Sequence, residues 1–306
     1  MNLHLGMFVG VGVMAGGLYF LHREIDRIFA EEKRRSRAPF KEKLLRPPGE
    51  SLRLKIEELH DEFMEQGLVL AVTTACTGGA IMVFTFQAWW MNGIVWTIIS
   101  AIGFACGRHR WNKLKGLRKT LRNYRLGFDG ERYVAEKLSE LIGQGYRVFH
   151  DFLFDMKPGG DATNFNIDHI VVGPAGVFVL ETKTYRQPNG ELPEGDERHK
   201  VRGDGDALLL PGGHRQRKPL KQVRKNADEL SKFLTGTSPS RVPVYPIIAM
   251  PGWYTEEEAF PDLLVLNPLR ISARISRFSQ SDVLPPSEVR MIADRIEAHC
   301  RNVDSA

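Results

Sequence analysis

The stretch IDHIVVGPAGVFVLETK, residues 167–183, decides the fold of this chain. Two apolar runs, residues 167–172 and 177–183, flank the turn sequence GPAG, and this pattern predicts a β-hairpin with a four-residue turn. The hairpin is expected to lie in the centre of a sheet covered on both sides, because both of its faces are apolar. One face carries Ile170, Val172, Val177 and Val179, and the other carries Ile167, Val171, Phe178 and Leu180.

The register of this hairpin places three charged side chains together. If Val172 faces Val177 across the turn, Asp168 lies directly opposite Glu181, with the two Cβ atoms about 5 Å apart on the same face. Strand side chains alternate with a period of two, so Lys183 points to that face as well. The sequence therefore predicts two carboxylates and a lysine at one end of a buried sheet.

Two carboxylates this close repel each other unless a proton or a cation lies between them. Mg²⁺ or Mn²⁺ would relieve the repulsion, because these ions prefer oxygen ligands and leave room in their shell for water and phosphate oxygens. The lysine could then stabilise negative charge on a phosphate. An ordinary ion pair between Lys183 and one of the acids is an equally good interpretation of the spacing alone.

Helices and strands are predicted to alternate on either side of the hairpin. Helical periodicity covers residues 129–142 and 287–301, and strand-like patterns cover residues 147–154 and 242–250. Residues 187–218 are rich in glycine and charge and are expected to form a surface loop beside the site. This alternation indicates an α/β domain over residues 127–306.

Charge divides the chain into two parts with different properties. The whole chain of 306 residues carries a formal charge of +5, but residues 1–126 hold 19 basic and 11 acidic residues, whereas residues 127–306 hold 23 and 26. The net charges are thus +8 and −3. The hydrophobic fraction of 42% excludes a wholly disordered chain, and three widely spaced cysteines exclude a disulfide scaffold.

The N-terminal part is predicted to be an all-α membrane anchor. Uncharged runs at about residues 3–21, 68–86 and 91–107 are near the length that crosses a bilayer. Buried helices of a soluble core are the alternative. Residues 22–55 hold 11 basic residues and residues 108–125 hold eight, so the positive-inside rule places both in the cytoplasm. The expected protein is an integral membrane protein with its N-terminus outside and its C-terminal domain cytoplasmic.

Several short motifs resemble the NERD (nuclease-related) domain of the restriction-endonuclease-like PD-(D/E)XK superfamily. The resemblance covers about residues 125–270 and is specific in its combination, although each motif alone is weak. The motifs are Gly127-x-x-Gly130-Glu131, Ile167-Asp168-His169, Glu181-Thr182-Lys183 and Pro219-Leu220-x-Gln222-Val223-x-x-Asn226. The implied fold class is α/β, with a restriction-endonuclease-like mixed central sheet flanked by helices.

The resemblance also implies a role for each site residue. Asp168 and Glu181 would be the metal ligands for Mg²⁺ or Mn²⁺, and Lys183 would be the catalytic lysine. Glu131 would help to complete the metal shell or orient water, and Gln222 would be a supporting polar residue. His169 points to the opposite face from Asp168 and is expected to be a core histidine.

The expected function is that of a membrane-anchored, Mg²⁺-dependent nuclease that hydrolyses phosphodiester bonds at the cytoplasmic face. Its expected partners are nucleic acid, with DNA favoured over RNA, and the lipid bilayer. The alternative is a membrane-tethered scaffold that binds nucleic acid or protein through a non-catalytic nuclease-like fold, which the −3 charge of the domain favours. A basic cluster between Arg215 and Lys225 could contact phosphates or could be a solvated helix start.

Overall fold

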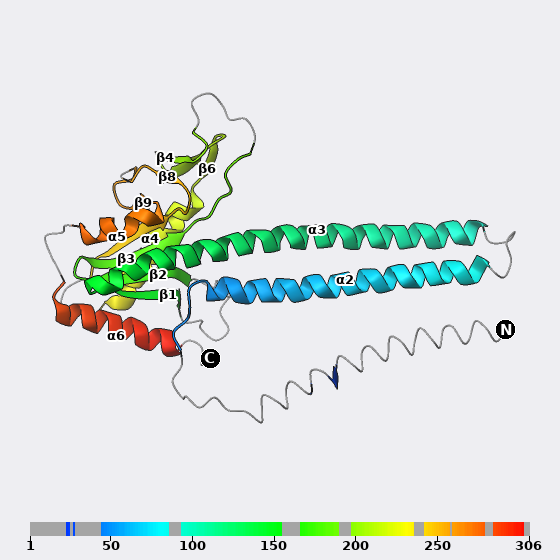
Figure 1. Ribbon diagram of the computed structural model, residues 1–306, viewed down its shortest axis with the longest axis horizontal. Helices are drawn as coiled ribbons and strands as arrows, with labels where there is room; N and C mark the ends of the chain where they lie inside the picture. The colour runs from blue at the N-terminus through cyan, green and yellow to red at the C-terminus, as the bar shows by residue number, and fades with distance from the viewer. Residues whose placement is uncertain are drawn as a thin grey trace. The chain divides into compact units, whose positions relative to one another are not determined.

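The computed structural model of the chain describes residues 23, 24, 27, 44–85, 93–154, 166–189, 197–235, 242–257, 259–278 and 284–302 (Figure 1). The helices are α2 (Glu50–Thr85), α3 (Gly93–Leu138), α4 (Lys218–Leu234), α5 (Pro268–Ser276), α6 (Pro286–Asn302) and the 3₁₀ helix η1 (Ser139–Gln144). The strands are β1 (Arg147–Leu153), β2 (Asn166–Gly173), β3 (Gly176–Thr182), β4 (Lys200–Asp204), β5 (Ala207–Leu210), β6 (His214–Gln216), β7 (Val244–Ala249), β8 (Tyr254–Thr255) and β9 (Leu264–Leu266).

The central sheet has five strands in the order β1-β2-β3-β7-β9. The first three strands pair antiparallel, whereas β7 and β9 join in parallel, so the sheet is mixed. Helix α4 makes the connection from β3 to β7, which a parallel pair requires. The predicted α/β class with a mixed sheet flanked by helices is confirmed.

The predicted register of the central hairpin is also confirmed. Val172 pairs with Val177, and His169 pairs with Leu180, so the same register sets Asp168 opposite Glu181. The turn is tighter than expected because Gly173 and Gly176 themselves pair, which leaves two residues at its tip. Every residue of β3 is buried, as expected for a strand in the middle of a covered sheet.

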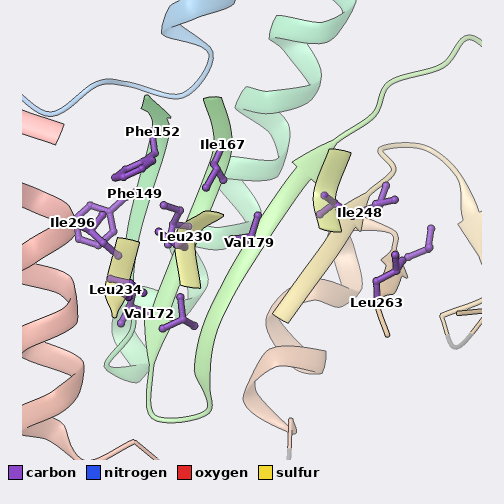
Figure 2. Close-up of a cluster of buried hydrophobic side chains, with 14 of the residues drawn as sticks. Phe149, Phe152, Ile167, Val172, Val179, Leu230, Leu234, Ile248, Leu263 and Ile296 are labelled. Atoms are coloured by element: carbon purple, nitrogen blue, oxygen red, sulfur yellow. The ribbon is translucent and has the colours of Figure 1, made fainter. Parts of the chain in front are cut away.

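Two hydrophobic cores lie on the two faces of this sheet. One core joins the sheet to α4 and α6 through residues such as Leu230, Leu234 and Ile296 (Figure 2). The other joins it to the end of α3, to η1 and to α5 through residues such as Val134, Leu141 and Ile271. Ile167 belongs to the first core, which differs from the predicted assignment to the opposite face.

A second, four-stranded sheet replaces the expected surface loop at residues 187–218. Strands β4, β5 and β6 form an antiparallel meander, and β8 adds in parallel to β4. Ala207 and Leu208 are buried, and Leu208 belongs to the first core. The prediction of a loop was wrong because short strands separated by glycines lack a clear apolar alternation.

Helix α3 extends well beyond its expected limits. The sequence predicted a helix starting at Asp129, but residues 93–138 form one 46-residue helix without a proline. The predicted domain boundary at residues 126 and 127 therefore falls inside a helix. Among the described residues, 62–116 form one compact unit, and residues 44–61 group with residues 117–302 in a second unit.

Within the first unit, parts of α2 and α3 pack as antiparallel helices. Gln66 accepts a hydrogen bond from Arg110, Glu62 pairs with Lys113, and Gly103 lies against the Thr77 side chain. Of the segments predicted as the second and third membrane spans, residues 68–85 belong to α2 and residues 93–107 belong to α3, and the rest lie outside the described residues. No helix in the described part of the chain is both long and apolar enough to cross a membrane, and the span predicted at residues 3–21 lies outside that part. The predicted spans are thus not confirmed.

Candidate active site

The end of the β2–β3 hairpin buries two carboxylates side by side. Asp168 is 6% exposed and Glu181 is 1% exposed. Asp168 Oδ2 accepts a hydrogen bond of 2.7 Å from the backbone N–H of Thr182, which ties the two strands together beyond their last paired residues. Burial, followed by the charges of Glu181 and Glu131, raises the pKa of Asp168 well above its ordinary value.

Lys183 is the cation of this group. Its ammonium donates a hydrogen bond to Glu181 Oε1, while about a quarter of the side chain, 27%, stays exposed. Burial acts to lower the pKa of Lys183, but the charges of Glu181 and Asp168 outweigh that effect and raise it. The lysine is therefore charged, and it partly compensates two buried acids. Glu181 keeps a raised pKa because burial outweighs the contribution of Lys183.

Glu131 reaches the same place from helix α3. The preceding residue, Gly130, allows the helix to approach closely, since a Cβ at that position would lie 2.1 Å from Thr184 Cγ2. Glu131 is 6% exposed, and its Oε2 is buried without a hydrogen-bond partner. Burial, then the charges of Asp151 and Glu181, raises the pKa of Glu131 to about 8. We call Glu131, Asp168, Glu181 and Lys183 the acid–lysine cluster.

Helix α4 contributes an amide to the cluster. Asn226 is fully buried and donates from Nδ2 to Glu181 Oε2 at 3.2 Å and to the carbonyl of Asn166 at 3.3 Å. Gln222, the predicted supporting residue, is half-buried one turn earlier on α4 and forms no hydrogen bond with these carboxylates in the described structure. Asn226 was not among the predicted site residues, although its spacing of four from Gln222 puts both on one helix face.

His169 is a core residue, as expected from a side chain that points to the other face of the sheet from Asp168. It is fully buried, its Nδ1 lies 2.9 Å from His150 Nδ1, and its Nε2 lies 3.3 Å from Thr182 Oγ1. Burial lowers the pKa of both histidines, to about 4 for His150. Neutral imidazoles that bond to each other are thus part of the packing beside the site.

The donor set suits a hard divalent cation. Carboxylate oxygens from Asp168 and Glu181 lie together, and the buried oxygens Glu131 Oε2 and Asn226 Oδ1 lack partners. In the described ranges, no three His, Cys, Asp or Glu side chains are arranged to hold a metal ion by themselves. A metal would therefore depend on one or two carboxylates plus water, which is the usual manner of Mg²⁺ binding.

All three arginines of the predicted basic cluster pair with acids. Arg215 lies 2.9 Å from Asp204, Arg217 lies 3.0 Å from Asp206, and Arg224 makes two bonds to Asp262. These pairs are exposed and individually weak. They nevertheless reduce the positive potential that a phosphate backbone would meet on this surface.

An α/β domain with a mixed sheet and an acid–lysine cluster at its hairpin end agrees with the nuclease-related class. Residues 126–251 match the family described as the nuclease-related domain, NERD. The matched region includes all four residues of the acid–lysine cluster and Gln222.

One short segment of the chain is similar to a bacterial protein. An uncharacterized protein of Bacillus anthracis is 44% identical over 59 residues, which is 19% of this chain and 26% of that relative. The chain thus matches about a quarter of the relative's length. No solved structure matches the chain.

Proposed function

We propose that this protein is a metal-dependent nuclease that hydrolyses phosphodiester bonds of nucleic acid. The observation that carries the proposal is the buried pair Asp168 and Glu181, with Lys183 bonded to Glu181, at the hairpin end of a nuclease-related domain. Burying this many acids in one place costs stability, and acids with strongly perturbed pKa values cluster at functional sites.

Each residue has a distinct role in the proposed reaction. Asp168 and Glu181 would hold Mg²⁺ or Mn²⁺, which when bound polarises a phosphate oxygen and lowers the pKa of water. The Lys183 ammonium remains charged and would stabilise the negative charge that grows on the phosphate oxygens. Glu131, with a pKa of about 8, can hold or release a proton near neutral pH, as a general acid or base must.

A cleavage assay tests this proposal directly. Full-length protein is incubated with single-stranded DNA, duplex DNA and RNA in Mg²⁺, Mn²⁺ or EDTA. We expect cleavage that EDTA abolishes and that Asp168→Asn, Glu181→Gln and Lys183→Met each reduce by at least about 100-fold. Glu229→Gln is a matched control, because Glu229 is a partly exposed acid that bonds to Lys232 on α4. Equal cleavage by all variants would contradict the proposal.

A binding scaffold is the second candidate, and the charge distribution favours it. Residues 127–306 carry a net charge of −3, and the arginines near α4 are paired with acids. Calorimetric titration with Mn²⁺ separates the two candidates. A site that Asp168→Asn and Glu181→Gln abolish supports the nuclease, whereas no metal binding supports the scaffold.

Membrane attachment is a separate proposal. It rests on the uncharged runs flanked by basic segments, and on large apolar side chains that stay exposed on α2 and α3, including Leu68, Ile102 and Phe104. Alkaline extraction of cell membranes tests attachment, and a reporter fused after Ala306 tests a cytoplasmic C-terminal domain. Release of the full chain into the soluble fraction would contradict attachment.

A further inference from the structure

A segment outside the family-matched region lies against the acid–lysine cluster. Residues 44–51, here called the strap, lead into the first turn of α2 and group with the nuclease-related domain. Gly49 is buried with φ of +76°, and a Cβ added to it would lie 2.7 Å from Phe128 Cδ2 and 3.5 Å from Glu131 Oε2. The backbone of the strap thus lies beside the carboxylate oxygen of Glu131 that has no hydrogen-bond partner.

A buried ion pair fastens the strap to β1. Asp151 Oδ2 accepts hydrogen bonds from Arg46 Nε at 2.7 Å, from the Ser51 backbone N–H at 3.0 Å and from Ser51 Oγ at 2.9 Å. Arg46 Nη2 lies 2.6 Å from the same oxygen, and the two side chains are 9% and 0% exposed. Because Ser51 lies in the first turn of α2, the same carboxylate also satisfies a free N–H at the start of that helix.

The other carboxylate oxygen of Asp151 is connected to the acid–lysine cluster by a series of hydrogen bonds. Asp151 Oδ1 accepts from Asn166 Nδ2 at 3.1 Å, and the carbonyl of Asn166 accepts from Asn226 Nδ2. The same amide group of Asn226 donates to Glu181. One buried carboxylate therefore connects the strap, the start of β2 and, through α4, an acid of the cluster.

The backbone at Asp151 is specialised for this arrangement. Its φ is +48°, the one left-handed residue other than glycine in the described part of the chain. The β1–β2 register would set Asp151 opposite Asp168, since His150 pairs with His169 and Phe152 pairs with Ile167. The left-handed conformation interrupts pairing at this position. Unfavourable backbone conformations of this kind persist where the surroundings hold them in place, often at functional sites.

We propose that the strap completes the active site and that Arg46 is a positioning residue, which acts through Asp151 to hold Gly49 against Glu131. The inference rests on the proposed nuclease function for its consequence in catalysis. The structural part of the proposal is that the Arg46–Asp151 pair fixes the backbone around Glu131. This part can be tested without measuring nuclease activity.

The simpler explanation is that the ion pair only stabilises the fold, and a double variant separates the two explanations. Arg46→Met alone leaves the Asp151 charge buried without its partner and should destabilise the protein. Arg46→Met combined with Asp151→Asn removes both charges, so stability should largely recover. If the pair positions Glu131, kcat should stay about 10- to 100-fold below wild type in the double variant, with KM little changed.

Two further variants sharpen the kinetic measurement. Arg46→Lys keeps the charge but lacks the two-pronged guanidinium geometry, so kcat should fall between wild type and Arg46→Met. Lys55→Met is the control, because Lys55 forms an exposed pair with Glu58 on α2, outside the strap. Recovery of kcat together with stability in the double variant would overturn the proposal.

Hydrogen exchange of the full-length chain gives the readout that needs no activity. The double variant should exchange faster than wild type over residues 44–51 and over residues 128–133, while β3 keeps its protection. Unchanged exchange at residues 128–133 would overturn the proposal. An inactive wild type would contradict the nuclease function alone, and the exchange measurement would still decide whether the strap positions Glu131.

Discussion

At the scale of single residues, the buried carboxylate of Glu181 depends on two donors, Lys183 and Asn226. We expect Asn226→Leu to destabilise the protein by about 1–3 kcal/mol, because it removes a buried donor from an acid that cannot reach water. Gln222→Leu, one turn earlier on the same helix, should change stability by less than about 0.5 kcal/mol. Urea denaturation measures both, and a larger cost at Gln222 would reverse our assignment of the supporting residue.

Glu131 should make stability depend on pH in an unusual direction. Its carboxyl has a folded pKa of about 8 against an ordinary value of 4.5, so between these values the folded state holds a proton that the unfolded state has lost. Stability therefore falls as pH rises from about 5 to 8, by at most about 1.4 kcal/mol per pH unit from this group. In EDTA, Glu131→Gln should make this fall in urea-unfolding stability less steep, while Asp168 and Glu181, whose pKa values are also raised, keep part of the pH dependence. An unaltered slope would contradict the raised pKa.

At the scale of secondary-structure elements, one glycine lets α3 bring Glu131 to the hairpin. A Cβ at Gly130 would lie 2.1 Å from Thr184 Cγ2, so Gly130→Ala should push the helix away from the segment that follows β3, destabilise the fold by about 1–3 kcal/mol and lower cleavage. Gly116→Ala, in the same helix with open space around it, should be neutral or stabilising by up to about 1 kcal/mol. Thermal unfolding compares the two, and equal effects would show that close packing at Gly130 is unimportant.

At the scale of the whole molecule, acids limit how the domain meets a polyanion. Asp206 pairs with Arg217 and lies 3.7 Å from Arg215, so Asp206→Asn should tighten the binding of duplex DNA and steepen its salt dependence. Each additional phosphate contact changes the slope of log affinity against log salt by about 0.9. Anisotropy titrations in EDTA measure this. Glu229→Gln, on α4, changes the net charge of the protein by the same amount. It should leave the slope of log affinity against log salt unaltered.

The sequence was sufficient for the hairpin because its information is local. Alternation and the turn at residues 173–176 specify a register, and that register fixes which side chains share a face. The amino-acid pattern alone therefore places Asp168, Glu181 and Lys183 together correctly. The meander of β4–β6 could not be recognised in the same way, because its strands are short and only partly buried.

Contacts between distant segments were not predictable, since no periodicity encodes them. Arg46 and Asp151 are 105 positions apart, and Asn226 and Glu181 are 45 apart. Nothing near Arg46 distinguishes it from the other basic residues at positions 22–55, which as a group were interpreted as determinants of membrane orientation.

The sequence by itself thus determined the α/β class, the register of the central hairpin and the grouping of its three charged residues, because these follow from local patterns along the chain. The family resemblance had already implied Glu131 as a site residue. Only the tertiary structure showed that close packing at Gly130 brings Glu131 to the cluster, that Asn226 rather than Gln222 bonds to Glu181, and that the strap lies beside Glu131. Each of these contacts joins segments that are distant in sequence. Their proximity therefore depends on how the whole domain packs to bury its apolar surfaces.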